Sequence, residues 1–341
     1  MGCQAADEAL RGDRVSTAQA GLIPAPATPP AVPPRRTESS ASWRLSDRIG
    51  LGFAWLLGLL FCAIAAAIVL YFLVEGIRYL RPSLLVTNPT AGVTASQTGG
   101  FLDPLLGTVI IAAMAMAIAL PAGVGIAVWL SEYGRPAALA RVTESVIEML
   151  AGTPSVVLAL FGTLLFEAPA LGFLSQTSHG VVLGQSFFAA AAMLSLVGLP
   201  MVVANVREGL QAIPAHVREA SYAVGKTKIA TTRRVLLPAA RPSVLTGSML
   251  GLGRVIGDTA IVLLLLGGTL TFSSANSTPL LGMLRGTGDT LTGYIYYNAP
   301  TGDGNQPSKA YAAAFVLMLI VLALNVGVDF AVRRSRAGLW G

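Results

Sequence analysis

The amino-acid sequence predicts an all-α polytopic membrane protein with six transmembrane helices, and three observations support this fold class. Of the 341 residues, 54% are hydrophobic and only 12% are charged, whereas a soluble domain carries about 25% charged residues. Six apolar stretches each come close to the roughly twenty residues that a helix needs to cross a bilayer. Most of the 23 Lys and Arg residues lie between these stretches, which is where membrane proteins place them.

The composition and the few reactive residues argue against several function classes. The net charge of +6 does not indicate nucleic-acid binding, because the basic residues are spread over many loops and form no single patch. Cys3 and Cys62 lie far apart, and neither His179 nor His216 has a neighbour at a metal-ligand spacing. No nucleophile–base pair stands out either. We therefore expect no catalytic residue, no metal site and no cofactor on this chain.

The chain begins with a polar, Pro-rich segment. Residues 1–47 include the run PAPATPPAVPPRR and have too little apolar surface to fold, so we expect a disordered cytoplasmic tail. The tail lacks the apolar core of a secretory signal. Residues 48–101 are expected to hold the first transmembrane helix and an extracytoplasmic loop. A main transmembrane domain follows over residues 102–332, and residues 333–341 form a short cytoplasmic tail.

The apolar stretches fix the expected helices. The six spans are expected at about 50–74, 105–130, 145–166, 181–204, 245–267 and 310–332. The third is the least regular, because it contains Glu148 and Pro154. Pro121, Pro154 and Pro200 all lie inside spans and predict kinks, which bundled membrane helices tolerate.

The distribution of Lys and Arg predicts the orientation of these spans. Basic residues concentrate in the N-terminal tail, in the loop 131–143, in the loop 207–241 and at the C-terminus. Loops that carry the excess of Lys and Arg stay in the cytoplasm. We therefore expect a multi-pass protein of the cell membrane, with both termini and the loop 207–241 in the cytoplasm.

The longest polar run between two spans extends from Arg207 to Pro238, and it has internal order. Pro214 is expected to start a helix, because the missing N–H of proline is no loss in a first turn. Gly225 is placed to end that helix, and a second helix should end at Pro238. The residues expected to share the apolar face of the first helix are Val217, Ala220 and Val224.

The same loop resembles the EAA loop of ABC importer permeases. The family pattern is EAA, three residues, Gly, nine residues and then Ile-x-Leu-Pro. This chain has Glu219-Ala220-Ser221, then Gly225, then Val235-Leu236-Leu237-Pro238, so Ser221 replaces the second Ala and Val235 replaces Ile. The resemblance implies that the short helix docks on a separate ATP-hydrolysing subunit. The implied coupling residues are Glu219, Ala220, Ser221, Gly225, Leu237 and Pro238.

A near match to a phosphate-binding P-loop lies inside this loop. The stretch Ala220-x4-Gly225-Lys226-Thr227 lacks the first Gly, and no strand precedes it. A P-loop needs a glycine-rich turn after a strand, so that backbone N–H groups can surround the phosphates. We therefore expect ATP to be bound and hydrolysed on a partner chain.

The fifth span contains two charged residues, Arg254 and Asp258, four positions apart on one face of the predicted helix. A charge at the bilayer centre costs about 2.5–3.5 kcal/mol on insertion scales, so intramembrane charges often mark a substrate pathway. We favour a pathway lined by Arg254, Asp258 and Thr259 over a purely structural ion pair. An Arg fork suits a tetrahedral oxyanion, because its N–H groups match two oxygens at once. The glycines expected to permit close approach there are Gly247, Gly251, Gly253 and Gly257.

Further stretches resemble the permeases of phosphate ABC importers. Residues 251–259, GLGRVIGDT, are similar to the GLxRxxGET segment of that family, with Asp258 in place of the usual Glu. Residues 150–155 and 160–162 resemble the LAGxPS and LFG stretches. Gly99-Gly100 before Gly107-Thr108, and Ile295-Tyr296-Tyr297-Asn298, resemble the A-type permease more than its C-type sister. The resemblance covers about residues 99–332, so residues 102–332 are expected to form a type-1 ABC transporter domain.

The resemblance implies a function and a set of partners. The chain is expected to be the A-type permease subunit of an ATP-driven importer that moves inorganic phosphate into the cytoplasm. Its implied partners are a homologous C-type permease, an ATP-binding subunit dimer and an extracytoplasmic phosphate-binding protein. Membrane lipid surrounds it, and nucleic acid has no role. The alternatives are a permease for another solute such as sulfate or molybdate, and a membrane sensor or scaffold.

Overall fold

The computed structural model describes residues 45–87, 99–175, 177–178, 181–267, 286–302 and 306–337. Most of the predicted tail 1–47 therefore lies outside the described residues, as do parts of the segments that join the first predicted span to the second and the fifth to the sixth. The chain divides into two units, residues 1–64 and residues 65–341, and each is considered by itself.

The elements follow one another in this order: α2 (Leu45–Tyr79), α3 (Pro82–Val86), α4 (Leu102–Val128), η2 (Trp129–Tyr133), α5 (Ala137–Gly152), α6 (Ser155–Glu167), η3 (Gly172–Leu174), β1 (Thr177–Ser178), β2 (Val181–Val182), α7 (Phe187–Gln211), α8 (Ala215–Ala223), α9 (Lys228–Thr231), η4 (Thr232–Leu236), α10 (Leu237–Ala239), α11 (Arg241–Ile256), α12 (Ala260–Leu265), α14 (Leu291–Asn298) and α15 (Pro307–Ala337). Strands β1 and β2 pair antiparallel as a two-stranded sheet. The described part of the protein is all-α apart from this small pair, as predicted.

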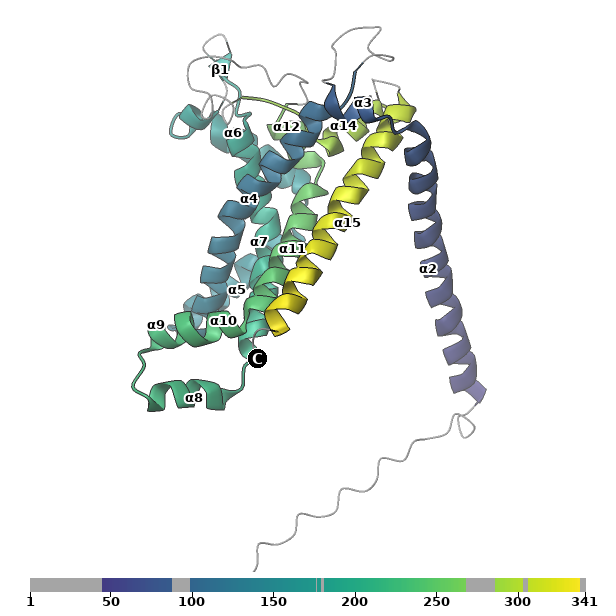
Figure 1. The fold of residues 1–341 in the computed structure, drawn as a ribbon. Helices are drawn as coiled ribbons and strands as arrows, with labels where there is room; N and C mark the ends of the chain where they lie inside the picture. The colour runs from purple at the N-terminus through teal and green to yellow at the C-terminus, as the bar shows by residue number, and fades with distance from the viewer. Residues whose placement is uncertain are drawn as a thin grey trace, which may run out of the picture. The chain divides into compact units, whose positions relative to one another are not determined.

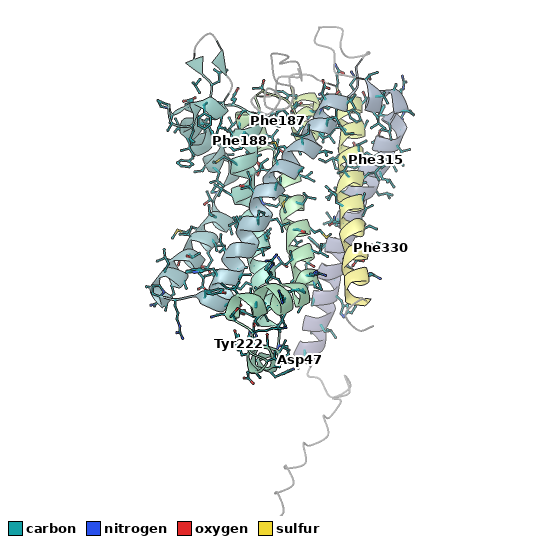
Figure 2. All side chains as sticks on the ribbon, turned by 60° about the vertical axis from the view of Figure 1, so that its left-hand side comes forward. Asp47, Phe187, Phe188, Tyr222, Phe315 and Phe330 are labelled. Carbon is teal, nitrogen blue, oxygen red and sulfur yellow. The ribbon has the colours of Figure 1, made fainter. Side chains whose placement is uncertain are left out.

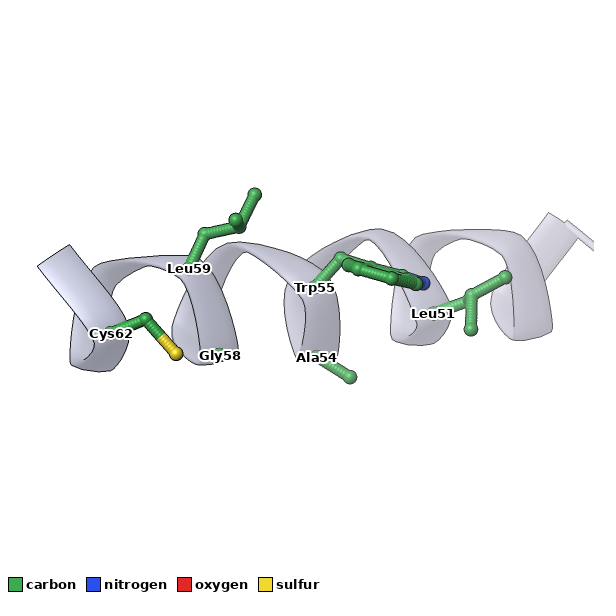
Figure 3. A pocket seen from close by; sticks show the side chains of 6 residues that line it. All are labelled: Leu51, Ala54, Trp55, Gly58, Leu59 and Cys62. Atoms are coloured by element: carbon green, nitrogen blue, oxygen red, sulfur yellow. The ribbon is translucent and has the colours of Figure 1, made fainter. Parts of the chain in front are cut away.

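The described part of the first unit is the beginning of α2, residues 45–64. From Ile49 onward its side chains are apolar on every side, so this part of the helix has no polar face to turn toward water. A shallow groove on its surface is walled by this helix alone (Figure 3), and its lining residues are Leu51, Ala54, Trp55, Gly58, Leu59 and Cys62. Such a surface suits lipid or another apolar helix. The first predicted span, 50–74, lies inside α2.

Within the described residues, four helices are individually long and apolar enough to cross a membrane: Ile49–Tyr79, Leu102–Tyr133, Phe187–Gln211 and Pro307–Gly327. Two bent helix pairs raise the number to six if each pair is one span. The first pair is α5 with α6, bent by 106°, and the second is the run 228–239 with α11, bent by 69°. The six predicted spans therefore correspond to four helices and two interrupted elements.

The third predicted span, 145–166, is not one helix. The chain leaves the helical conformation at Thr153, whose ψ is 129°, and α6 starts directly after Pro154. The residue before a proline avoids the α conformation, and proline has no N–H to donate. The Thr153 hydroxyl donates to the carbonyl of Met149 at 2.7 Å and so binds one of the carbonyls left free at the end of α5.

The fourth span begins later than the predicted residue 181, because Val181 and Val182 belong to β2. Helix α7 starts at Phe187, where the Ser186 hydroxyl accepts the N–H of Ala189 at 3.0 Å and caps the helix.

The polar loop 207–241 also differs from expectation at its end. Helical residues continue through Pro238 to Ala239, because a π-helical turn over Thr232–Leu236 precedes the proline. The bend lies at Ala240 instead.

Helix α7 lies at the centre of the second unit, between α4 and α11 (Figure 1). It is also the most buried of the four candidate spans. Its contact with α11 is made through glycines. A Cβ atom on Gly251 of α11 would lie 3.2 Å from the carbonyl oxygen of Gly198 on α7, and one on Gly247 would lie 3.0 Å from Cβ of Asn205. The predicted close approach is therefore confirmed for Gly247 and Gly251.

The two ends of this bundle differ in composition. At one end, an apolar cluster of Ala127, Val206, Leu210 and Leu236 packs beneath the loop that carries α8. At the other end, Phe101, Leu291, Tyr294, Ala312 and Ala313 form a second cluster. Figure 2 shows Tyr222 of α8 at one end and Phe187 and Phe188 of α7 at the other.

The glycine contact between α7 and α11 predicts an asymmetric response to substitution. Gly251→Val adds side-chain atoms against Gly198 and Val202, whereas nothing lies within 4 Å of a Cβ on Gly253. We expect Gly251→Val to lower stability by about 1–3 kcal/mol, the usual cost of overpacking, and Gly253→Val to cost much less. Thermal unfolding of the detergent-solubilised protein measures both. Equal midpoints in the two variants would contradict the close-packing account.

Candidate functional site

The fifth span is broken where its charged residues lie. Helix α11 ends at Ile256, and Gly257 is its C-cap. The Asp258 carboxylate accepts the N–H of Ile261 at 3.0 Å, which caps the start of α12. The prediction of one continuous helix over 245–267, with Arg254 and Asp258 on one of its faces, is therefore wrong. The physical reason is that Gly257 readily ends a helix, and the Asp258 carboxylate then binds a backbone N–H that would lack a partner in the first turn of α12.

Arg254 and Asp258 still come together across the break, but loosely. The Arg254 Nη1 atom lies 3.9 Å from Asp258 Oδ2. The Arg254 side chain is 47% exposed, whereas that of Asp258 is 2% exposed. Among the described residues, the Arg254 guanidinium donates no hydrogen bond, and the ion pair at 3.9 Å is too long to be one, so its N–H groups remain available to a ligand.

The surroundings of Arg254 leave its guanidinium accessible. Gly253 and Gly257, on either side of it, are exposed. An adjoining face of α11, with Gly251 and Val255, is buried against α7. The glycines of α11 therefore have two roles. Gly251 permits the contact with α7, and Gly253 leaves space beside the guanidinium. Thr259 is half-buried at the N-cap position of α12.

A buried polar cluster adjoins the Asp258 backbone, and sequence reasoning missed it. The Thr292 hydroxyl donates to the carbonyl of Asp258 at 3.4 Å and lies 2.8 Å from the Thr290 hydroxyl. Thr108 of α4 accepts the N–H of Leu291 at 2.9 Å. Asp289 is 3% exposed; one of its carboxylate oxygens accepts the Thr290 N–H at 2.7 Å, and the other has no partner among the described residues.

A sequence signal for this cluster exists. The hexapeptide Arg-x-x-Gly-Asp-Thr occurs at residues 254–259 and again at residues 285–290. In both copies the Asp-Thr pair leads directly into a short helix, α12 or α14.

Burial raises the pKa of Asp289 to about 7, and the hydrogen bond from the Thr290 N–H offsets part of that shift. Asp289 lies between α12 and α14, outside the candidate spans.

The loop that carries α8 is the second candidate site. Gly225 has a φ of +77°, in the left-handed region that favours glycine. Its N–H donates to the carbonyl of Tyr222 at 2.9 Å, and the N–H of Lys226 donates to that of Ser221 at 3.3 Å. This pair of bonds is a Schellman motif, which closes the end of α8. Gly225 therefore ends the helix as predicted.

The face that α8 buries is not the predicted one. Ala220 and Val224 are exposed, Val224 at 71%. Ser221 is buried, and its hydroxyl lies 2.9 Å from that of Thr231 on α9. This polar contact holds α8 against α9, so the helix turns Glu219 and Ala220 outward. Leu237 and Pro238 are half-buried in α10.

Two further residues of this region had no predicted role. Arg218 of α8 and Glu132 of η2 form an ion pair at 3.1 Å, and their side chains are 22% and 6% exposed. No local pattern links two residues that lie 86 positions apart.

The residues that resemble a P-loop, Gly225 to Thr227, follow a helix rather than a strand, so they do not form the phosphate-binding turn. Across the described ranges, no group of three His, Cys, Asp or Glu residues is placed to hold a metal ion.

Comparison with known proteins gives consistent matches. Residues 119–339 match the family model described as "Binding-protein-dependent transport system inner membrane component". The chain is 35% identical over 258 residues to the Phosphate transport system permease protein PstA 1 of Mycobacterium tuberculosis (strain ATCC 25618 / H37Rv), which covers 74% of this chain and 78% of that protein. It is 30% identical over 250 residues to the Phosphate transport system permease protein PstC of Xylella fastidiosa (strain 9a5c), covering 68% and 71%.

A solved structure shares the fold. The crystal structure of a bacterial alginate ABC transporter, in complex with a periplasmic protein bound to alginate pentasaccharide, contains a chain that aligns with a TM-score of 0.56. The alignment covers 86% of this chain and 98% of that chain at 16% identity.

The buried carboxyl of Asp289 predicts a pH-dependent stability. Its folded pKa of about 7 lies above the ordinary value of 3.8, so the folded state binds more protons between these values. The free energy of unfolding should therefore fall by roughly 2–3 kcal/mol from about pH 5 to about pH 8, at about 1.4 kcal/mol per pKa unit. Asp289→Asn should remove this decline. Chemical unfolding across that pH range tests it, with Asp329→Asn, at an exposed carboxylate, as the control that keeps the decline.

Proposed function

Because the chain belongs to the family of binding-protein-dependent transport system inner membrane components and is a permease of an ABC importer, we propose that it carries inorganic phosphate into the cytoplasm as the A-type subunit. The observation that carries this proposal is the accessible Arg254 guanidinium beside the break between α11 and α12. The similarity to two phosphate permeases supports it.

Arg254 is the proposed anion-facing residue. A guanidinium presents a planar fork of N–H donors that pairs with two oxygens of a tetrahedral anion at once. Asp258 accepts the N–H of Ile261 and lies 3.9 Å from the guanidinium, so in this proposal it positions Arg254 and holds the helix break without meeting the anion. Thr259, next in the chain, supplies a hydroxyl at the same break.

The coupling to ATP hydrolysis is proposed to run through α8. Its outward residues Glu219 and Ala220 would contact a separate ATP-hydrolysing subunit, and Gly225 fixes the end of the helix. The exposed apolar side chains beside them support a protein contact: Tyr222 is 43% exposed, and Val224 and Ile229 are each 71% exposed. No step of ATP hydrolysis is assigned to this chain.

The remaining partners follow from the same proposal. A second permease of the C-type completes the pathway, an ATP-binding subunit dimer docks on the α8 side, and an extracytoplasmic protein delivers phosphate. The excess of Lys and Arg in the loop 207–241 supports a cytoplasmic position for α8. An ATP-hydrolysing subunit also belongs in the cytoplasm, so the two arguments agree.

The role of Arg254 is tested by replacing its fork with a single charge. Arg254→Lys keeps the charge but loses bidentate pairing, and Arg254→Gln loses the charge as well. We expect phosphate uptake per membrane-inserted protein to fall by roughly tenfold or more in both, since a hydrogen bond to a charged group contributes about 1.5–3 kcal/mol. The assay is uptake of radiolabelled phosphate by cells that lack their own phosphate importer and carry this chain with its partners.

A matched control is Arg78→Lys. Arg78 and Glu75 also form an ion pair at 3.9 Å, with the Arg78 side chain 69% exposed, and this pair lies in α2. Uptake by Arg78→Lys should equal that of the wild type. Normal uptake in both Arg254 variants would remove Arg254 from the pathway. Uptake of sulfate or molybdate in place of phosphate would identify another oxyanion as the substrate.

The docking role of α8 is tested at Gly225. Gly225→Val forces a β-branched residue into the left-handed region, which costs roughly 1–2 kcal/mol for an L-residue, and it should distort the end of α8. Gly225→Asn adds a side chain into space that is open within 4 Å of the Cβ position, and Asn tolerates this conformation. We expect Val, but not Asn, to reduce both phosphate uptake and co-purification of the ATP-hydrolysing subunit. Full co-purification with Gly225→Val would argue that α8 is not the docking element.

A further inference from the structure

The connection between α8 and the end of α4 is unusually specific. Arg218 donates from Nε and Nη2 to Glu132 Oε1, at 3.2 and 3.1 Å. The same guanidinium donates from Nη1 to the carbonyl of Ile213 at 2.7 Å and from Nη2 to that of Leu210 at 2.8 Å. One side chain thus joins α8, the end of α7 and η2. Among the described residues, this is the one ion pair that links α8 to another element.

A second contact reaches the same turn of the chain. Lys228, at the start of α9, lies with Nζ 4.8 Å from the ring centroid of Tyr133, the residue after Glu132. A cation at this distance over an aromatic face is attracted to it. The helices on both sides of Gly225, α8 and α9, therefore each contact η2. Figure 1 shows α8, α9 and α10 together at one end of the bundle.

The turn that receives both contacts is π-helical. Residues Trp129–Tyr133 follow α4 without a break, and the N–H of Gly134 donates to the carbonyl of Trp129 at 2.8 Å. A π-helical turn holds one more residue than an α-helical turn and so rotates the side chains that follow it. Here it ends α4 with Glu132, whose carboxylate is nearly fully buried against the Arg218 guanidinium.

Helix α4 also reaches the neighbourhood of Arg254. A Cβ atom on Gly251 would lie 3.7 Å from Cε of Met116 on α4, and Gly251 precedes Arg254 by three residues. Helix α4 also contacts α7 and α11. It therefore touches the α8 loop through η2 at one end and the Arg254 region further along.

We propose that Arg218 and Glu132 are positioning residues that fasten α8 to α4, so that a displacement of α8 by the ATP-hydrolysing subunit moves α4 together with α11. This inference rests on the proposed docking of α8. The chain itself connects α8 to α11 through α9 and α10. Without the ion pair, this covalent connection, the link from α7 to α8 and the Lys228–Tyr133 contact remain. The direct charge contact between α8 and η2 is lost, so α4 follows α8 less closely.

A second ion pair in the same region provides a matched control. Arg207 of α7 and Glu144 of α5 are 2.5 Å apart, with side chains 35% and 33% exposed. This pair also joins two helices near the same loop, but neither residue belongs to α8, α9 or η2. A variant of Glu144 therefore reports the general effect of removing an ion pair there.

The experiment uses the assembled importer in proteoliposomes, with the phosphate-binding protein enclosed on the side that corresponds to the extracytoplasmic face of the importer. The variants are Glu132→Gln, Arg218→Lys, their double variant and Glu144→Gln. For each we measure ATP hydrolysis without the binding protein, hydrolysis stimulated by phosphate-loaded binding protein, and phosphate moved per ATP hydrolysed. Thermal midpoints of the complexes are recorded alongside.

Glu132→Gln should co-purify with the ATP-hydrolysing subunit and keep its unstimulated hydrolysis. Its stimulation, and the phosphate moved per ATP, should fall roughly tenfold, within the usual range of coupling between two sites. Arg218→Lys should show the same loss, and the double variant no more than either single change, because the residues act through one contact. Glu144→Gln should retain wild-type stimulation even where its thermal midpoint drops.

Two outcomes would overturn the inference. One is wild-type stimulation in Glu132→Gln. The other is an equal loss in Glu132→Gln and Glu144→Gln that follows their thermal midpoints, because that loss would be one of stability alone. The proposed function fails in a different way: the wild-type complex would not bind the ATP-hydrolysing subunit, or its hydrolysis would not respond to phosphate.

Discussion

The close contact between α7 and α11 is the constraint on which the rest of the structure depends. Gly198, Gly247 and Gly251 bring the two helices so near that a single Cβ atom would touch the opposing backbone or side chain. In a membrane, helices gain little from hydrophobic burial, so close packing of small residues is the main attraction available. This contact fixes the rotation of α11. Val255 is then buried, whereas the Arg254 side chain stays 47% exposed.

Much of the fold can be read from the sequence, because the signals are local. Apolar length predicts the helices α2, α4, α7 and α15, and proline at position 154 predicts a disturbance in the third span. The residues at which helices begin and end were harder to predict. Val181 and Val182 are apolar enough to belong to the fourth span, and only the cap at Ser186 fixes where α7 begins. The helical run through Pro238 depends on a π-helical turn, for which no sequence rule exists.

The site could be predicted only in part, for the same reason. Arg254 and Asp258 stand out as charges in an apolar stretch, and Gly225 stands out by its spacing from Glu219. The break at Gly257 and the capping by Asp258 depend on which conformation satisfies the backbone after folding. The pairing of Arg218 with Glu132, and the cluster of Asp289 with Thr108, join segments far apart in the chain. Which residues meet across such distances is decided by tertiary packing alone.

The hydroxyl pair of Ser221 and Thr231 has a consequence for assembly. Together with the Schellman motif at Gly225, it gives α8 its final shape within this chain, since both contacts are internal. A surface that is already ordered loses little conformational entropy when another protein binds it. A partner that docks there would meet a rigid template, and its departure would leave the helix formed. Subunits could then exchange on a folded permease, without a folding step in each cycle of assembly.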